Sequence, residues 1–230
     1  MITKNFDWRK YLLEFLAIFI GISLAFALDK WNENRREIRS ESKILTEMKH
    51  GLALDLQDVT ENIKGHHAGI RSCNYFKTLI ENEPVNLDSL QFHYFMLWRD
   101  FISIQNKTGY ESLKSKGLEL IRNDSLRFQI VEIYDFKFEI IEKLEEQYSE
   151  MQLNKSYFHP INDLLAEYME FDKEGKLINI RQPILLSKKD KNRVFSFFYR
   201  MIGAREYRLR FYNNIKGEIE KLIQEIEKEL

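Results

Sequence analysis

The chain has 230 residues with only 3 Pro and 9 Gly, so helix breakers are scarce. Its 35 basic and 36 acidic side chains give a net charge of −1, which argues against a general nucleic-acid binder. A single cysteine, Cys73, excludes an internal disulfide framework and a cysteine-based zinc site, and we expect it to be a small buried side chain. The composition favours an all-α protein with long helices.

The first predicted element is the apolar helix YLLEFLAIFIGISLAFAL, residues 11–28. A bilayer span needs roughly 17–25 residues, so this stretch is just long enough. Trp8 and Tyr11 lie at one end and Trp31 at the other, where aromatic side chains anchor a helix in the two membrane interfaces. We predict an uncleaved transmembrane helix. A cleaved signal peptide and a soluble core helix are the alternatives.

One face of this helix carries a packing stripe, whose members follow at steps of three and four: Glu14, Ala17, Gly21 and Ala25. Small side chains let a second helix approach closely, so we expect the span to associate along this face. A carboxylate in lipid is costly, and Glu14 therefore lies either in the seam between helices or near the headgroups. The flanking Lys and Arg residues are ambiguous, and our interpretation has the N-terminus inside and the C-terminal domain outside.

The chain then divides into an N-terminal tail (1–10), the span (11–28), a long juxtamembrane helix (29–82) and an antiparallel helical bundle or coiled-coil domain (83–230). Apolar residues at helical spacing predict the long helix, with Gly51, Gly65 and Gly69 as points where it kinks or ends. Pro84 breaks it.

Within the bundle region, a short aromatic helix is predicted over about 88–101. A second short helix begins at a capping box formed by Thr108 and Glu111 and ends at Gly117. A long helix starts near Asn123 and is interrupted or restarted at Pro160.

The stretch around Gly175 is poorly helical and predicts a loop or hairpin. Ser187 and Asp190 then form a capping-box-like start, and from there the last helix runs to the C-terminus.

Two segments carry a resemblance to a known family: KYLLEFLAIFIGISLAFALDKWNENRRE and TGYESLKSKGLELIRNDSLRFQIVEIYD. Together, over about a quarter of the chain, they resemble a family of small single-span bacterial membrane proteins known only as a domain of unknown function. The resemblance implies an envelope protein with a helical domain. With the orientation above, it places the span in the bacterial inner membrane and the domain in the periplasm, and it implies no activity.

Residues with chemical potential are few. Glu47 and His50 have the spacing of one Glu-x-x-His motif, but a di-iron bundle needs a second motif and two further glutamates. No nucleotide-binding or hydrolase motif is present. We expect no enzymatic activity, no metal and no cofactor. A possible recognition patch is formed by Tyr110, Glu111, Lys114 and Lys116, although capping and packing account for most of this segment.

The resulting hypothesis is a membrane-anchored interaction, scaffold or accessory subunit of a bacterial envelope complex. Its expected partners are membrane lipid and either further copies of itself or other envelope proteins, and not nucleic acid. One alternative is a subunit of an ion-driven or transport machine that uses Glu14 in the membrane. Another is a ligand-sensing helical domain.

Overall fold

The computed structural model describes residues 8–230 and confirms an all-α protein that is 81% helical. The α-helices are α1 (Trp8–Ile80), α2 (Leu90–Trp98), α3 (Thr108–Lys116), α4 (Asp124–Val131), α5 (Phe138–Glu146), α6 (His159–Leu165) and α7 (Lys188–Glu229). Short 3₁₀ or π segments adjoin them: η1 (Leu87–Ser89), η2 (Leu118–Leu120), η3 (Glu132–Lys137), η4 (Ser149–Met151), η5 (Asn154–Phe158) and η6 (Ala166–Tyr168). Strands β1 (Met169–Phe171) and β2 (Leu177–Ile180) form an antiparallel hairpin.

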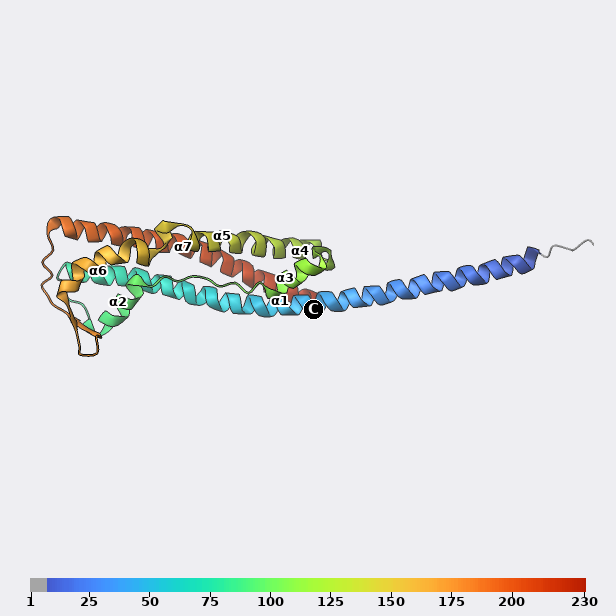
Figure 1. Cartoon of the computed structure of the whole chain (residues 1–230), viewed down its shortest axis with the longest axis horizontal. Helices are drawn as coiled ribbons and strands as arrows, with labels where there is room; N and C mark the ends of the chain where they lie inside the picture. The colour runs from blue at the N-terminus through green and yellow to red at the C-terminus, as the bar shows by residue number, and fades with distance from the viewer. Residues whose placement is uncertain (1–7) are drawn as a thin grey trace, which may run out of the picture.

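α1 is one unbroken helix of 73 residues and extends far beyond the folded domain (Figure 1). Its side chains are exposed from Tyr11 to Arg39 and pack into the domain from Ile44 onward. α7 lies against this second part, and its C-terminal end lies where α1 leaves the bundle (Figure 1). Because residues 44–80 share their cores with later residues, the domain division predicted at residue 83 falls inside one packed body.

Two apolar cores follow one another along the pair formed by α1 and α7. The core nearer the apolar part of α1 combines residues 44–59 of α1 with α3, α4, α5 and residues 212–226 of α7. The distal core combines residues 73–80 of α1 with α2, α6, β2 and residues 194–201 of α7. Between the two cores, α1 and α7 carry buried polar side chains. These residues, Asn62, His66, Arg205 and Arg208, form a polar layer at the middle of the bundle.

Three glycines of α1 mark close approaches, and the prediction that the helix ends at one of them is wrong. A Cβ atom at Gly65 would lie 2.3 Å from the ring of Phe101, and one at Gly69 would lie 2.2 Å from the guanidinium of Arg205. Gly51 likewise faces a neighbouring side chain at 3.3 Å. A helical glycine costs about 1 kcal/mol relative to alanine, and here close packing offsets that cost.

The end of the domain nearest the apolar part of α1 contacts this helix directly. Arg122 donates from Nη2 to the side-chain oxygen of Asn34 at 2.5 Å, and its backbone N–H donates to the carboxylate of Glu41 at 2.9 Å. Asn34 lies six residues after Leu28, which is about 9 Å along a helix. The folded domain therefore begins within about two helical turns of the apolar segment.

Several predicted helix boundaries are confirmed. Gly117 ends α3 with a φ of 99°, a left-handed conformation that favours glycine. The side chain of Asn123 accepts backbone N–H groups at the start of α4, and Ser187 accepts the N–H of Asp190 at the start of α7. The predicted hairpin around Gly175 is present, and α6 restarts the helix at Pro160.

The capping box predicted from Thr108 and Glu111 is wrong. Lys107 occupies the N-cap position of α3 and makes no capping hydrogen bond through its side chain. Glu111 instead forms an ion pair with Lys114 at 2.7 Å, and the N–H of Thr108 approaches the side-chain oxygen of Asn106 at 3.4 Å. The side-chain acceptor at the start of α3 is therefore Asn106, which precedes the helix, and not Thr108, as the capping-box pattern predicts.

We predict that Gly109→Ala destabilises the protein. The added Cβ would lie 2.8 Å from Cγ and 2.9 Å from the backbone nitrogen of Met48, so α1 and α3 would have to separate, at a cost of about 1–3 kcal/mol. Gly217→Ala in α7 is the matched control, because it meets nothing within 4 Å and should stabilise by about 0.5–1 kcal/mol. Denaturant unfolding in detergent, followed by circular dichroism, measures both. Equal effects in the two variants would contradict the close α1–α3 contact.

Candidate functional site

An extended segment, residues 99–107, lies along one face of α1 and is called the strap here. It is neither helix nor strand, so its backbone groups need other partners. Side chains of α1 supply them at successive helical turns. The hydrogen-bonded pairs are Asp55 with the N–H of Asn106 (2.7 Å), Asp58 with the N–H of Ile104 (3.2 Å) and Asn62 with the carbonyl of Ile102 (3.1 Å). Residue numbers fall along the strap as they rise along α1, so the two run antiparallel.

The strap occupies a stripe of small and polar residues on α1. Its members follow at helical steps of three and four: Gly51, Asp55, Asp58, Asn62, Gly65 and Gly69. The glycines leave room for the strap and its neighbours, and the polar side chains pair with its backbone. Sequence reasoning missed this site because it followed the apolar positions of the same helix. The polar and glycine positions between them recur at helical spacing, and this pattern predicts a second, polar face on the same helix.

Arg205 joins α7 to the beginning of the strap. Its side chain is fully buried, and Nη2 lies within hydrogen-bonding distance of the carbonyls of Met96 (3.1 Å), Leu97 (3.4 Å) and Arg99 (3.0 Å). These carbonyls lie at the C-terminal end of α2, where a cation is favoured by the helix dipole. Burial lowers the pKa of Arg205 to about 10, so the side chain stays charged at neutral pH.

Glu145 and His66 complete the polar layer around the strap. Glu145 accepts hydrogen bonds from the hydroxyl of Tyr212 and, at 3.0 Å, from the N–H of Ser103, and burial raises its pKa. Neither ring nitrogen of His66 has a hydrogen-bond partner within residues 8–230. Burial and the nearby arginines hold the pKa of His66 well below its usual value, so the ring is neutral.

Asp100 connects this layer to the turn that precedes α6. Its Oδ1 lies 3.9 Å from Nη1 of the buried Arg208. The same carboxylate accepts the backbone N–H groups of Leu153 and Asn154, at 3.1 and 3.3 Å, where η5 begins. A carboxylate at a helix N-terminus stabilises the helix start. The polar layer therefore positions the segment that carries residues 148–157.

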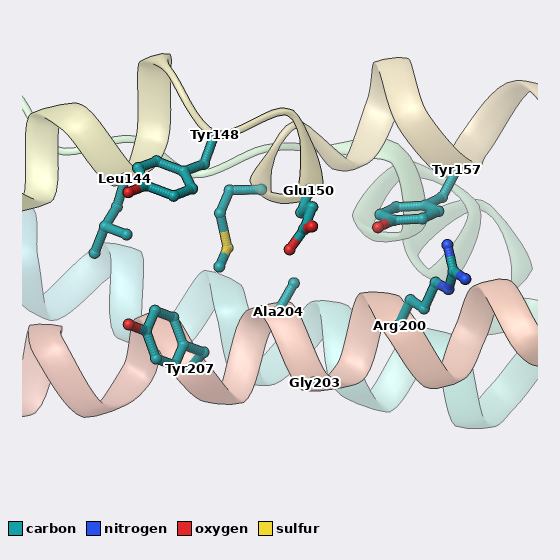
Figure 2. Close-up of a pocket in the computed structure, with 9 residues that line it drawn as sticks. Leu144, Tyr148, Glu150, Tyr157, Arg200, Gly203, Ala204 and Tyr207 are labelled. Atoms are coloured by element: carbon teal, nitrogen blue, oxygen red, sulfur yellow. The ribbon is translucent and has the colours of Figure 1, made fainter.

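A surface groove of about 580 Å³ opens between that segment and α7 (Figure 2). Gly203 and Ala204 form its floor, and nothing lies within 4 Å of the point where a Cβ of Gly203 would stand. The other lining residues are Leu144, Tyr148, Glu150, Met151, Tyr157, Arg200 and Tyr207. The carboxylate of Glu150 points toward the floor, while the guanidinium of Arg200 lies at one end beneath Tyr157 (Figure 2).

The groove and the polar layer are formed by neighbouring residues of the same helices, α5 and α7. Leu144 in the groove adjoins Glu145 in the layer, Ala204 adjoins Arg205, and Tyr207 adjoins Arg208. Successive residues of a helix point in different directions, so α5 and α7 each present one side chain inward and the next toward the groove. The buried charges therefore fix the helices that form the groove.

The predicted packing stripe of the span lies on an exposed face of α1. Glu14, Ala17, Gly21 and Ala25 are all exposed, and nothing lies within 4 Å of a Cβ built at Gly21. Within residues 8–230, no other element packs onto this stripe.

The predicted interface anchors are exposed as well. Tyr11 lies in the first turns of α1. The side chain of Trp8 stacks with Arg9 at 5.8 Å, and that of Trp31 with Arg35 at 4.9 Å.

The possible recognition patch is divided between the core and the surface. Tyr110 is 1% exposed, donates to Asp135 at 2.6 Å and stacks on Tyr134, so it cannot contact a partner at the surface. Glu111 and Lys114 pair with each other on the surface. Lys116 donates to Ser40 of α1 at 2.7 Å. The contact between Lys116 and Ser40 joins α3 to α1.

Within residues 8–230, no group of three or more His, Cys, Asp or Glu side chains is placed to hold a metal ion. Cys73 is fully buried, as predicted, and burial raises the pKa of its thiol to about 11, which keeps it protonated and unreactive. No family model, curated protein or solved structure matches the chain, so the groove and the polar layer are interpreted from their own residues.

We predict that Asp55 makes stability depend on pH. Burial raises its pKa from 3.8 to about 6, so the folded protein holds a proton that the unfolded chain has released. This stabilisation is present below about pH 4 and is lost as the pH rises through 6, with an effect on the order of 2 kcal/mol.

Asp55→Asn keeps an oxygen for the N–H of Asn106 and removes the titration. Between pH 5 and 7.5, the unfolding free energy of this variant should change less than that of the unchanged protein. Urea unfolding across this range measures the difference, and identical pH dependences would show that Asp55 titrates normally.

Proposed function

We propose that this protein is a single-pass protein of the bacterial inner membrane whose helical domain lies in the periplasm and acts by binding other proteins of an envelope complex. The observation that carries the proposal is the continuity of α1. This helix contains a stretch long and apolar enough to cross a membrane, and the same helix supplies one side of both domain cores.

The exposed part of α1 favours a membrane span over a soluble core helix. None of its apolar window is buried within the chain, whereas a core helix would be covered. In water, exposed side chains such as Phe15, Ile18 and Phe26 would be unfavourable, and a bilayer removes them from water. The helix also continues without a break past the end of the apolar stretch, which is unlike a cleaved signal peptide.

The short connection gives the anchored domain a defined position. Contacts of the domain with α1 begin at Asn34, about 9 Å beyond Leu28, which is close to the thickness of the headgroup region. An uninterrupted helix has no flexible linker, so a rotation or shift of the span would reach both cores of the domain. This geometry suits a subunit that associates in the membrane and presents its domain to a partner.

We expect native mass spectrometry of the full-length protein, gently extracted from its own membrane, to show either a defined homo-oligomer or other chains in fixed ratio. Gly21→Ile should reduce that association because it fills the stripe of small residues on the span. Ser23→Ile places the same side chain on the opposite face and should leave the association intact. A monomer without co-purifying chains would contradict the proposal, as would equal loss in both variants.

A further inference from the structure

The groove between α7 and residues 148–157 has two charged side chains without partners. No ion pair or hydrogen bond links the side chain of Glu150 or Arg200 to any other residue of the described chain. Both side chains are exposed to solvent at the edge of the groove. Figure 2 shows Glu150 directed at the floor of the groove and Arg200 at its end, so an acceptor and a donor of opposite charge face the same open space.

The apolar part of the lining lies between and beside these charges. Tyrosine rings contributed by Tyr148 and Tyr207 stand near one end of the groove, and Tyr157 stands above Arg200 at the other (Figure 2). The floor has no side chain at Gly203 and only a methyl group at Ala204. Aromatic faces attract ammonium groups and cover apolar side chains, and an arginine fork binds carboxylates. The lining is therefore complementary to a zwitterion with an apolar middle.

The volume of the groove limits the size of the ligand, and its position indicates where the ligand comes from. A volume of about 580 Å³ lies in the range of small-molecule sites and exceeds what a single amino acid fills. Gly203 lies 26 residues before Glu229, or about 39 Å along α7, and Glu229 is at the membrane-side end, where it accepts a hydrogen bond from Asn123 at 2.6 Å. A headgroup within the bilayer cannot reach that far, so the ligand comes from solution.

We propose that this groove binds short peptides of two or three residues with free termini. The α-ammonium group pairs with Glu150, the α-carboxylate pairs with Arg200, and the peptide side chains lie over Gly203 and Ala204 between the tyrosines. This site goes beyond the proposed interaction role and does not depend on it, because it lies within one chain.

The test is calorimetric titration of the full-length protein, in a non-ionic detergent, with the tripeptide alanyl-leucyl-alanine. N-acetylation of the peptide removes its ammonium charge, and C-amidation removes its carboxylate. Each block should weaken binding about tenfold, as expected for one charge-assisted hydrogen bond. Arg200→Gln should weaken the free peptide about as much, with no further effect on the amidated form. Glu150→Gln should show the same relation with the acetylated form.

Gly203→Leu fills the floor and should abolish binding, whereas Gly217→Leu adds the same side chain to open space elsewhere on α7 and should not. Far-UV circular dichroism checks the fold of each variant, and the two charge variants test the proposal even if Gly203→Leu fails to fold. Three results would overturn the assignment: no binding of the free tripeptide at millimolar concentration, equal binding of the blocked peptides, or equal loss in both glycine variants.

Discussion

The fold depends on the way in which the strap is hydrogen-bonded. The strap is an extended, partly covered segment, and side chains from three helices pair with its backbone groups in place of a neighbouring strand. Asp55 and Asn62 of α1, Glu145 of α5 and Arg205 of α7 all contact residues 99–107. These contacts fix α1, α5 and α7 relative to one another at the level where the two apolar cores separate. Buried polar networks of this kind favour one arrangement of helices over others of similar hydrophobic burial.

The same layer explains why a groove exists at that level. α5 ends at Glu146, and the chain continues through short turns to η5, whose first N–H groups are held by Asp100. Because the wall is irregular there and α7 presents Gly203 opposite it, the surface remains open. A continuous helix packed on a larger side chain would close it. The groove is thus a consequence of interrupted helix geometry that is supported from inside.

The long helix has two parts of different composition. Apart from Glu14 and Ser23, residues 11–28 are apolar or aromatic on every side, which suits lipid, while the second part alternates apolar and polar positions, which suits a water-soluble bundle. The change occurs over the few residues between Leu28 and Asn34. Arg122 contacts the helix immediately after this change, so the packed domain starts where the membrane-compatible part stops.

The sequence by itself determined what depends on local chemistry: the all-α class, the apolar stretch at 11–28, the caps at Gly117 and Ser187, and the burial of Cys73. These follow from periodicity, φ preference and composition within a few residues. Only the tertiary structure decided what depends on residues far apart in the chain: the path of the strap, the inward position of Tyr110, and the groove. Each joins segments separated by 25 to more than 100 residues, and no local pattern specifies which distant backbone a buried side chain will meet.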